Sequence, residues 1–254
     1  MKEIINCKEL NQTIESLKDN NKPHEIHKTS LTTILKYKNL TFKETQGGLI
    51  KNNELYFINQ VKKYINENTM GVYCDRSKIN YIKEGKLTKH RWYSSNIYEI
   101  DLNAAYWNFA YKFNYINEQL FLKGKKVSKL TRLVSLGNLA KTTTILKFNG
   151  NHYEFVEQKR SEETEGVFFS VSLATDQTMQ MLRTIADKNF LFYWVDAIFL
   201  KTEKSKKDVC EYLKSQNIEF KIKKIDKILK DEININVVDK KGIRKFYYKQ
   251  NFKN

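Results

Sequence analysis

The sequence predicts an α+β protein in which an antiparallel sheet carries helices on one face. Segments with helically spaced apolar residues alternate with segments rich in β-branched and aromatic residues, without the regular spacing of repeated β-α-β units. Residues 190–200 form a nearly unbroken apolar run that reads as a pair of short strands. Residues 237–248 are typical of a hairpin around Lys241–Gly242. Together these features favour α+β architecture over a regularly wound α/β sheet.

The first part of the chain is expected to contain both helices and strands. The apolar residues of segments 7–20 and 53–66 recur at helical intervals. Residues 71–85 are rich in β-branched and aromatic side chains and predict one or two strands. Residues 96–101 form a short apolar strand that ends on an acid, Asp101.

The later part is expected to be mainly helical before it returns to strands. Residues 218–228 alternate apolar and polar side chains, as a half-buried strand does. The glycine between two lysines at 123–125 predicts a turn. The expected helices are residues 102–122, 127–141, 173–188 and 203–216.

Charge is the unusual feature of the composition. The chain has 254 residues, 41% of them hydrophobic, which is enough for a full core and too many for a disordered protein. Lys plus Arg is 45 and Asp plus Glu is 29, so the formal net charge is +16. Such an excess favours a polyanionic partner, because neutralised phosphates release counterions. A lysine-rich, AT-rich genome explains the charge equally well, and both explanations stay open.

The sequence predicts a soluble, cytoplasmic protein with no membrane partner. The three cysteines lie far apart without a C-x-x-C pair, so neither a zinc site nor a disulfide framework is expected. The first residues lack the apolar core of a secretory signal. No run of about 18 apolar residues suggests a membrane span.

Two aspartates interrupt apolar strands and are the first candidates for a functional site. Asp101 ends one strand and Asp196 lies inside the apolar run of 190–200. A lone carboxylate in such a setting is costly unless something pairs with it. Each has an ordinary explanation as well, since Asp101 could cap a following helix and Asp196 could face solvent at a strand end. The residues around them decide between these explanations.

The segment from Asp101 to Trp107 resembles motif A of family B DNA polymerases, D-x-x-S-L-Y-P. Asp101 and Tyr106 match five positions apart, whereas Ala104, Ala105 and Trp107 depart from the motif. This resemblance implies that Asp101 is a metal ligand. It also implies that the Tyr106 ring excludes a ribose hydroxyl and so selects deoxynucleotides; the alternative for Tyr106 is a core tyrosine.

Three further segments resemble later motifs of the same family, in the same order. Lys129 and Gly137 match the ends of motif B, K-x-x-x-N-S-x-Y-G, although Leu133, Val134 and Leu136 replace its Asn, Ser and Tyr. Tyr193 to Leu200 resembles motif C, Y-x-D-T-D-S-I-x-L, with Asp196 at the second aspartate and Trp194 at the first. Lys245 and Tyr247 resemble the K-x-Y element that follows motif C.

The resemblance covers about residues 85–248 and implies a minimal polymerase palm of phage or mobile-element type. It predicts a palm domain at 81–254 with short two-helix fingers at 102–142, after a helical or mixed region at 1–80 of unknown role. Only 28 residues separate Asp101 from Lys129, which leaves room for a fingers stub alone. Neither a thumb nor an exonuclease domain is expected, so a protein partner or homo-oligomer is expected to help hold the DNA.

The resemblance also implies the roles of the remaining site residues. Asp101, Asp196 and the backbone carbonyl of Leu102 would hold two Mg²⁺ or Mn²⁺ ions, which prefer hard oxygen ligands. Lys129 would neutralise the incoming triphosphate, and Arg132, one turn further along the same helix face, could assist. Lys245 and Tyr247 would contact the primer end on the DNA.

The implied activity is addition of deoxynucleotides (dNTPs) to the 3′ end of a primer on a DNA primer–template. One alternative is untemplated or primer-making DNA synthesis, which the absence of a thumb suggests. Another is a degenerate palm that acts as a DNA-binding or scaffold subunit. The replacement of a motif C acid by Trp194 suggests this last alternative.

Overall fold

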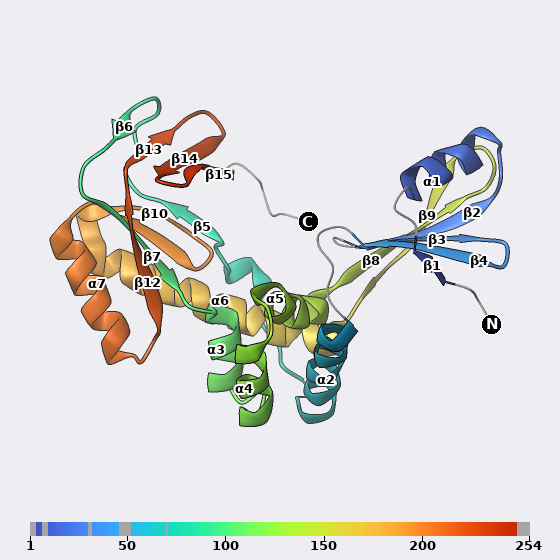
Figure 1. Cartoon of the computed structure of the whole chain (residues 1–254), viewed down its shortest axis with the longest axis horizontal. Coiled ribbons are helices and arrows are strands. Elements are labelled where there is room, and N and C mark those ends of the chain that lie inside the picture. Colours follow the sequence, from blue (N-terminus) through green and yellow to red (C-terminus); the bar gives the residue numbers. More distant parts are fainter. Residues whose placement is uncertain (1–3, 7–9, 30–31, 46–51, 70, 248–254) are drawn as a thin grey trace. The chain divides into compact units, whose positions relative to one another are not determined.

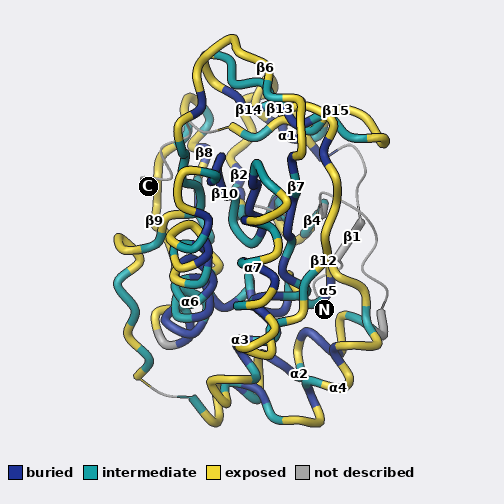
Figure 2. Tube along the Cα trace, turned by 90° about the vertical axis from the view of Figure 1, so that its left-hand side faces the viewer, coloured by how far each residue is buried: buried dark blue, intermediate teal, exposed yellow. Residues whose placement is uncertain are grey.

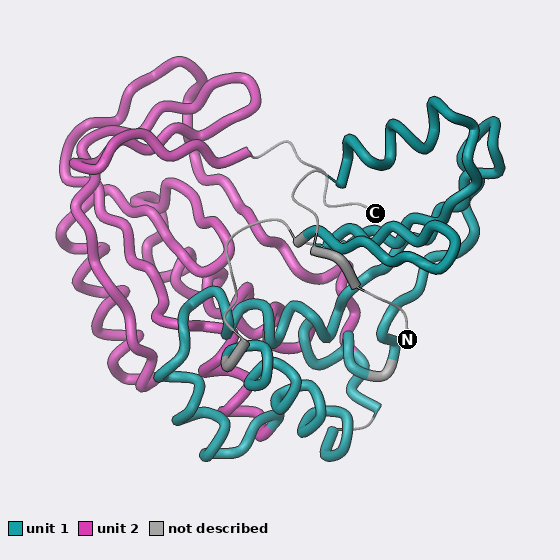
Figure 3. Tube along the Cα trace, turned by 45° about the vertical axis from the view of Figure 1, so that its right-hand side comes forward, with its two compact units in different colours: residues 1–73, 115–168 teal, residues 74–114, 169–254 magenta. Residues whose placement is uncertain are grey.

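A computed structural model describes residues 4–6, 10–29, 32–45, 52–69 and 71–247, in two compact units. Unit 1 comprises residues 1–73 and 115–168, and unit 2 comprises residues 74–114 and 169–254 (Figure 3). This division differs from the expected boundary at residue 80. The chain leaves unit 2 after residue 114 and returns to it at residue 169, so most of the segment between the motif A and motif C regions belongs to unit 1.

A six-stranded sheet forms one part of unit 1. Its first two strands are parallel and the other neighbours are antiparallel. In spatial order the strands are β1 (Ile4–Asn6), β4 (Leu40–Thr45), β3 (Thr32–Tyr37), β2 (His24–Lys28), β8 (Thr142–Phe148) and β9 (Tyr153–Arg160).

One face of this sheet is covered by helix α1 (Leu10–Asp19), which the helical spacing had predicted (Figure 1). Leu10, Ile14 and Leu17 lie on one side of α1 and pack against Ile26 and Leu35 of the sheet. Residues 7–9 of the expected helix lie outside the described residues.

Two further helices of unit 1 lie close to the expected segments, whereas one expected turn is part of a helix. Helices α2 (Asn52–Asn68) and α5 (Lys129–Gly137) lie where they were predicted, and a 3₁₀ turn, Asn138–Ala140, extends α5. The turn expected at residues 123–125 is wrong, because helix α4 (Glu118–Lys126) continues through Gly124. Gly124 is buried, and tertiary contacts outweigh the roughly 1 kcal/mol that glycine costs a helix interior.

A five-stranded antiparallel sheet is the centre of unit 2. In spatial order it contains β12 (Phe220–Ile225), β7 (Ile97–Leu102), β11 (Ala197–Leu200), β10 (Phe190–Trp194) and β5 (Ile82–Glu84). The apolar run at 190–200 forms the β10–β11 hairpin, and nearly every residue of these two strands is buried (Figure 2). Burial from both faces explains why the run lacks the alternation of a half-exposed strand.

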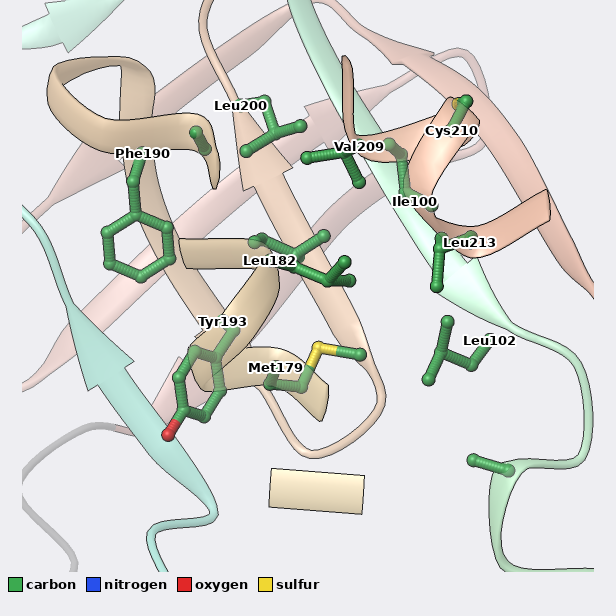
Figure 4. Packing of buried hydrophobic residues seen from close by; sticks show 13 residues of the cluster. Ile100, Leu102, Met179, Leu182, Phe190, Tyr193, Leu200, Val209, Cys210 and Leu213 are labelled. Carbon is green, nitrogen blue, oxygen red and sulfur yellow. The ribbon is translucent and has the colours of Figure 1, made fainter. Parts of the chain in front are cut away.

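Helices cover one face of the central sheet. The C-terminal part of α6 (Glu162–Ala186) and α7 (Glu203–Ser215) pack there with Met179, Leu182, Val209 and Leu213. These side chains meet the sheet residues Ile100, Leu102, Tyr193, Ile198 and Leu200 (Figure 4). Helix α3 (Ala105–Lys112) follows β7 and contributes Ala105 to the same cluster.

A second, four-stranded sheet covers the other face. Its strands are β15 (Gly242–Tyr247), β14 (Asn234–Asp239), β13 (Lys227–Lys230) and β6 (Trp92–Tyr93). Ile228, Ile235 and Val237 of this small sheet pack against residues such as Phe192 and Phe199 of the central sheet. The predicted hairpin around Lys241–Gly242 is the β14–β15 pair.

The predicted class is therefore confirmed as α+β with antiparallel sheets. Residues 71–85 contain one strand, β5, as expected, and a 3₁₀ turn, Arg76–Lys78, which the Asp75 side chain caps. The helix expected at 102–122 is broken into α3 and α4. In the part of the chain that the structure describes, no helix is long and apolar enough to cross a membrane.

Candidate functional site

The structure brings Asp101 and Asp196 to neighbouring positions in the central sheet. Strands β7 and β11 are antiparallel neighbours, and Asp101 lies opposite Ala197. The backbone N–H of Leu102 donates a hydrogen bond of 2.9 Å to the backbone carbonyl of Asp196. Adjacent strands lie about 4.8 Å apart, so the two acids sit side by side at one end of the sheet.

Asp196 occupies a two-residue turn between β10 and β11. Trp194 pairs with Ala197, which leaves Val195 and Asp196 as the turn residues. Val195 has a positive φ of 53°, a conformation that β-branched residues rarely adopt. Its N–H donates to the carbonyl of Tyr81 at 2.6 Å. The surrounding structure thus holds a strained turn in place, and such strain is characteristic of functional positions.

The corner after Asp101 is fixed by backbone hydrogen bonds rather than by a helix cap. Helix α3 begins at Ala105, and its N-cap residue is Ala104 with φ of 46° and no side-chain cap. The helix-cap explanation for Asp101 is therefore wrong. Asn103 donates through its backbone to the carbonyl of Glu219 at 2.9 Å and accepts from the Asn108 side chain at 2.7 Å. These bonds hold the backbone around Leu102, whose carbonyl is the third expected ligand.

A buried ion pair lies two residues before Asp101 on the same face of β7. Glu99 is 2% exposed and receives two hydrogen bonds from Arg244 of β15, at 2.9 and 2.6 Å. Lys223 on β12 lies 3.5 Å from Glu99, and Asp239 lies 3.3 Å from Arg244. A buried carboxylate needs such pairing, because an isolated charge there would cost several kcal/mol.

Arg244 also lies within electrostatic reach of Asp101. Its hydrogen bonds with Glu99 raise the pKa of Arg244, burial opposes the rise, and Asp239 and Asp101 add to it. Arg244 was not predicted as a site residue from the sequence. Strand alternation within the predicted hairpin could have indicated it, because Arg244 and Lys245 must point to opposite faces of β15 and only one of them can face the central sheet.

The structure does not bring Lys245 and Tyr247 to the face that carries Asp101. Phe246 contacts Phe192 and Phe199 of the central sheet with ring centroids 5.7 and 5.8 Å apart. Lys245 and Tyr247 therefore lie on the opposite, outward face of β15, where both are exposed. Trp194, in the position of the missing motif C acid, packs against Phe246 at 5.5 Å.

Tyr106 lies in a cluster of tyrosines close to Asp196. Burial raises the pKa of the Tyr106 hydroxyl, a hydrogen bond with Ser172 lowers it, and the nearby Tyr81 and Asp196 raise it further. Ser172 of α6 is 2% exposed and also shares a hydrogen bond with Tyr81. Tyr106 is therefore a partly buried residue that lies within electrostatic reach of Asp196.

Asp176 is a third carboxylate that the sequence analysis missed. It is 2% exposed on α6 and accepts hydrogen bonds from the Tyr193 hydroxyl at 2.5 Å and from Gln180 at 2.6 Å. Burial raises the pKa of Tyr193, and the bond to Asp176 raises it further. A signal was present, because Asp176 lies three residues before the core residue Met179 and so shares the apolar side of the helix. This network fastens β10, the strand that leads to Asp196, onto α6.

Lys129 and Arg132 belong to unit 1, whereas the two aspartates belong to unit 2. Lys129 is the exposed first residue of α5. Arg132 donates to the backbone carbonyls of Gly124 and Val127, both at 2.9 Å. Arg132 thus satisfies carbonyl groups at the end of α4, a structural task that the sequence did not reveal.

The donor set suits a hard cation that is bound together with substrate. Among the described residues, no group of three or more His, Cys, Asp or Glu side chains is placed to hold a metal ion. Mg²⁺ is commonly held by one or two carboxylates, with substrate phosphates and water completing the shell. Asp101, Asp196 and the Leu102 carbonyl fit that requirement, and they do not resemble a closed structural zinc site.

Comparison with protein-family models and with curated sequences adds no constraint on this site. No protein-family model and no curated protein sequence matches the chain, so its function must be inferred from its own residues.

Proposed function

We propose that the chain is a family B-like DNA polymerase palm that adds deoxynucleotides to a primer 3′ end. The single observation that carries this proposal is the pairing of β7 with β11. That pairing puts Asp101, at the end of β7, next to the turn that holds Asp196. The motif resemblance selects these two acids from distant parts of the sequence. If the motif matches were due to chance in a Lys- and Tyr-rich chain, there would be no reason for the two acids to lie close together in the fold.

The proposed reaction is an in-line displacement at the α-phosphate of the incoming nucleotide. Two bound Mg²⁺ or Mn²⁺ ions would supply charge stabilisation for the attacking and leaving oxygens. Asp101, Asp196 and the Leu102 carbonyl would hold these ions, while the ion pair between Glu99 and Arg244 links β7 of the central sheet to β15 of the small sheet. In this reaction the protein mainly serves to hold the carboxylates of Asp101 and Asp196 at a fixed separation, which the sheet determines.

The remaining expected contacts are part of the same proposal. Lys129 is exposed and offers an ammonium group for a triphosphate, whereas Arg132 already serves the end of α4. Lys245 and Tyr247 are exposed on the outward face of β15 and there offer a contact for a nucleic-acid strand. A partner protein or a second copy of the chain is proposed to help hold the primer–template.

Incorporation of labelled nucleotide tests the proposal directly. The full chain is incubated with primer–template and dNTPs, with Mg²⁺ or Mn²⁺ in one arm and excess EDTA in the other. We expect primer extension that EDTA abolishes and that fresh metal restores. Absence of incorporation with either metal, with and without template, would contradict the proposal. Product sequences that ignore the template would instead indicate untemplated or primer-making synthesis.

A change at Tyr106 tests the proposed sugar selection. Tyr106→Ala removes the ring, and we expect the preference for dNTPs over ribonucleotides to fall by roughly 10- to 100-fold, because the steric block to the 2′-hydroxyl is lost. Tyr106→Phe keeps the ring and loses only the bond with Ser172, so its preference should stay within about threefold of wild type. Kinetics with paired deoxy and ribo substrates measure the ratio. An unchanged ratio in Tyr106→Ala would assign Tyr106 to the core alone.

The second candidate function is a catalytically degenerate palm that binds DNA. The packing of Trp194 against Phe246 favours it, since a structural contact has replaced an acid at that position. This candidate predicts DNA binding without incorporation, and DNA binding that does not depend on Asp101 or Asp196.

A further inference from the structure

The six-stranded sheet of unit 1 has a polar face opposite helix α1. Ile26 and Leu35 point toward α1, so alternation turns their neighbours Glu25, His27 and Ile34 to the other face. The aromatic residues Tyr37, Phe42 and Tyr153 pack on the α1 side. The polar face therefore carries charged and hydroxyl side chains, and the aromatic rings on which bases could stack lie on the other face.

A depression of about 310 Å³ opens on this polar face. Ile34 and Ile145 contribute its apolar lining, and no carboxylate is among the described residues around it. The polar lining consists of His27, Thr29, Thr32, Lys141, Thr143 and Lys159. His27 pairs with Glu25 and Lys159 pairs with Glu157, so Lys141 is the lining cation to which no carboxylate of the described residues is bound. Together with the hydroxyl groups of the lining, it suits an anionic oxygen-rich ligand such as phosphate.

Lys141, which lines this depression, lies within electrostatic reach of lysines from two other elements. Partial burial lowers the pKa of Lys141 at the start of β8, and the positive charges of Lys62 on α2 and Lys43 on β4 lower it further. No carboxylate of the described residues is among the charges that act on Lys141. By contrast, Lys159 pairs with Glu157 at 2.9 Å. Like charges held together are unfavourable, so an anion placed among Lys43, Lys62 and Lys141 would relieve their repulsion.

The spread of these lysines favours a chain of phosphates over a single small anion. Strands β4 and β8 are separated by β3 and β2 in the sheet, so their backbones lie about 14 Å apart at the usual strand spacing. The charges of Lys43 and Lys141 interact although their strands are that far apart. Successive phosphates of a nucleic-acid strand can follow the face between the two strands. The formal net charge of +16 agrees with such a partner.

We propose that the polar face of the unit 1 sheet, around Lys43, Lys62 and Lys141, binds the phosphate backbone of a nucleic-acid strand. This binding surface belongs to unit 1 and does not require the acid pair of unit 2. It recognises backbone charge without reading bases, so its affinity depends steeply on salt and little on sequence.

Oligonucleotide binding by the full chain tests the proposal. The probe is labelled oligothymidylate of about 15 nucleotides, measured by fluorescence anisotropy over a range of salt concentrations. The buffer contains EDTA and no nucleotide, so the result is independent of metal binding at Asp101 and Asp196 and of the polymerase proposal. The test variant is Lys43→Gln/Lys141→Gln. The matched control is Lys22→Gln/Lys28→Gln, which removes the same charge from exposed positions outside the lysine cluster.

We expect the test variant to bind about 10-fold more weakly than wild type, with a salt dependence less steep by about 1.4 in the slope of log K against log salt. The control should stay within about twofold of wild type, and Lys43→Arg/Lys141→Arg should restore binding. Thermal melts confirm folding, and Lys141→Gln alone replaces the double variant if that variant unfolds.

Two outcomes would overturn the proposal. The first is equal affinity in test and control variants, whether both fall or neither does, because binding would then reflect general charge or another surface. The second is binding of polyglutamate of the same length as tightly as oligothymidylate, with the same loss in the test variant. That result would identify a general anion surface and not a nucleic-acid site.

Discussion

Asp101→Asn and Asp196→Asn are each expected to lower primer extension by about 10³-fold or more. Each substitution keeps the size of the side chain but removes a negative charge from a proposed metal site. Loss of metal-centred stabilisation is worth several kcal/mol, and each 1.4 kcal/mol is about a tenfold change in rate. Steady-state extension at saturating Mg²⁺ and Mn²⁺ measures the effect. Partial recovery in Mn²⁺ would be consistent with weakened metal binding.

The matched control is Asp226→Asn, an exposed acid in the same unit at the turn between β12 and β13. It should extend primers within about twofold of wild type, since the exposed acid is remote from the reaction. If the Asp101 and Asp196 variants also retain near wild-type extension, the two carboxylates are not metal ligands. If neither wild type nor variants extend primers but all bind DNA equally, the degenerate-palm candidate is supported.

Arg244→Ala is expected to give the largest loss of stability among simple substitutions near the site. It leaves Glu99 almost completely buried with only Lys223, at 3.5 Å, as a charged partner. Breaking a buried pair typically costs 3–5 kcal/mol; because Lys223 stays nearby, we expect about 3 kcal/mol. All three tryptophans, Trp92, Trp107 and Trp194, lie in unit 2, so tryptophan fluorescence during urea unfolding reports on this unit.

Two variants control for this interpretation. Lys207→Ala removes an exposed cation that lies 3.9 Å from Glu211 and should change the free energy of unfolding by less than about 0.5 kcal/mol. Glu99→Leu/Arg244→Met removes both charges and should recover most of the loss, because a well-packed apolar pair can replace a buried ion pair. If Arg244→Ala is as stable as wild type, the ion pair does not hold the two sheets together.

The α+β class and the two principal acids were accessible from the sequence because their signals are local. The apolar run at 190–200 is interrupted by one acid, and the strand ending at Asp101 is followed by Tyr106 at a motif spacing. Helix periodicity predicted α1, α2, α5 and α7 for the same reason. The apolar residues of each helix recur at helical spacing, and this spacing is visible in the sequence without knowledge of the segment against which the helix packs. Strands β2 and β3 were not predicted, although the residues of β2 alternate in burial.

The roles of Arg244, Asp176 and Arg132 could not be predicted from local sequence, because each role depends on a partner elsewhere in the chain. Arg244 is one of many cations until β15 is laid over β7, where it meets Glu99 145 positions earlier. Asp176 looks like an ordinary helix acid until the Tyr193 hydroxyl reaches it. Arg132 resembled a nucleotide-binding residue, yet its guanidinium is bonded to carbonyl groups at the end of α4.

The sequence by itself determined the class of fold, the basic charge and the choice of Asp101 and Asp196 as candidates. Only the tertiary structure decided that Asp101 lies beside the turn that holds Asp196, that Arg244 rather than Lys245 is within electrostatic reach of Asp101, and that α3 does not use Asp101 as its cap. The physical reason is that residue type and periodicity are properties of a short segment. Strand pairing and the direction of each side chain are set by contacts between segments, and those contacts exist only in the folded chain.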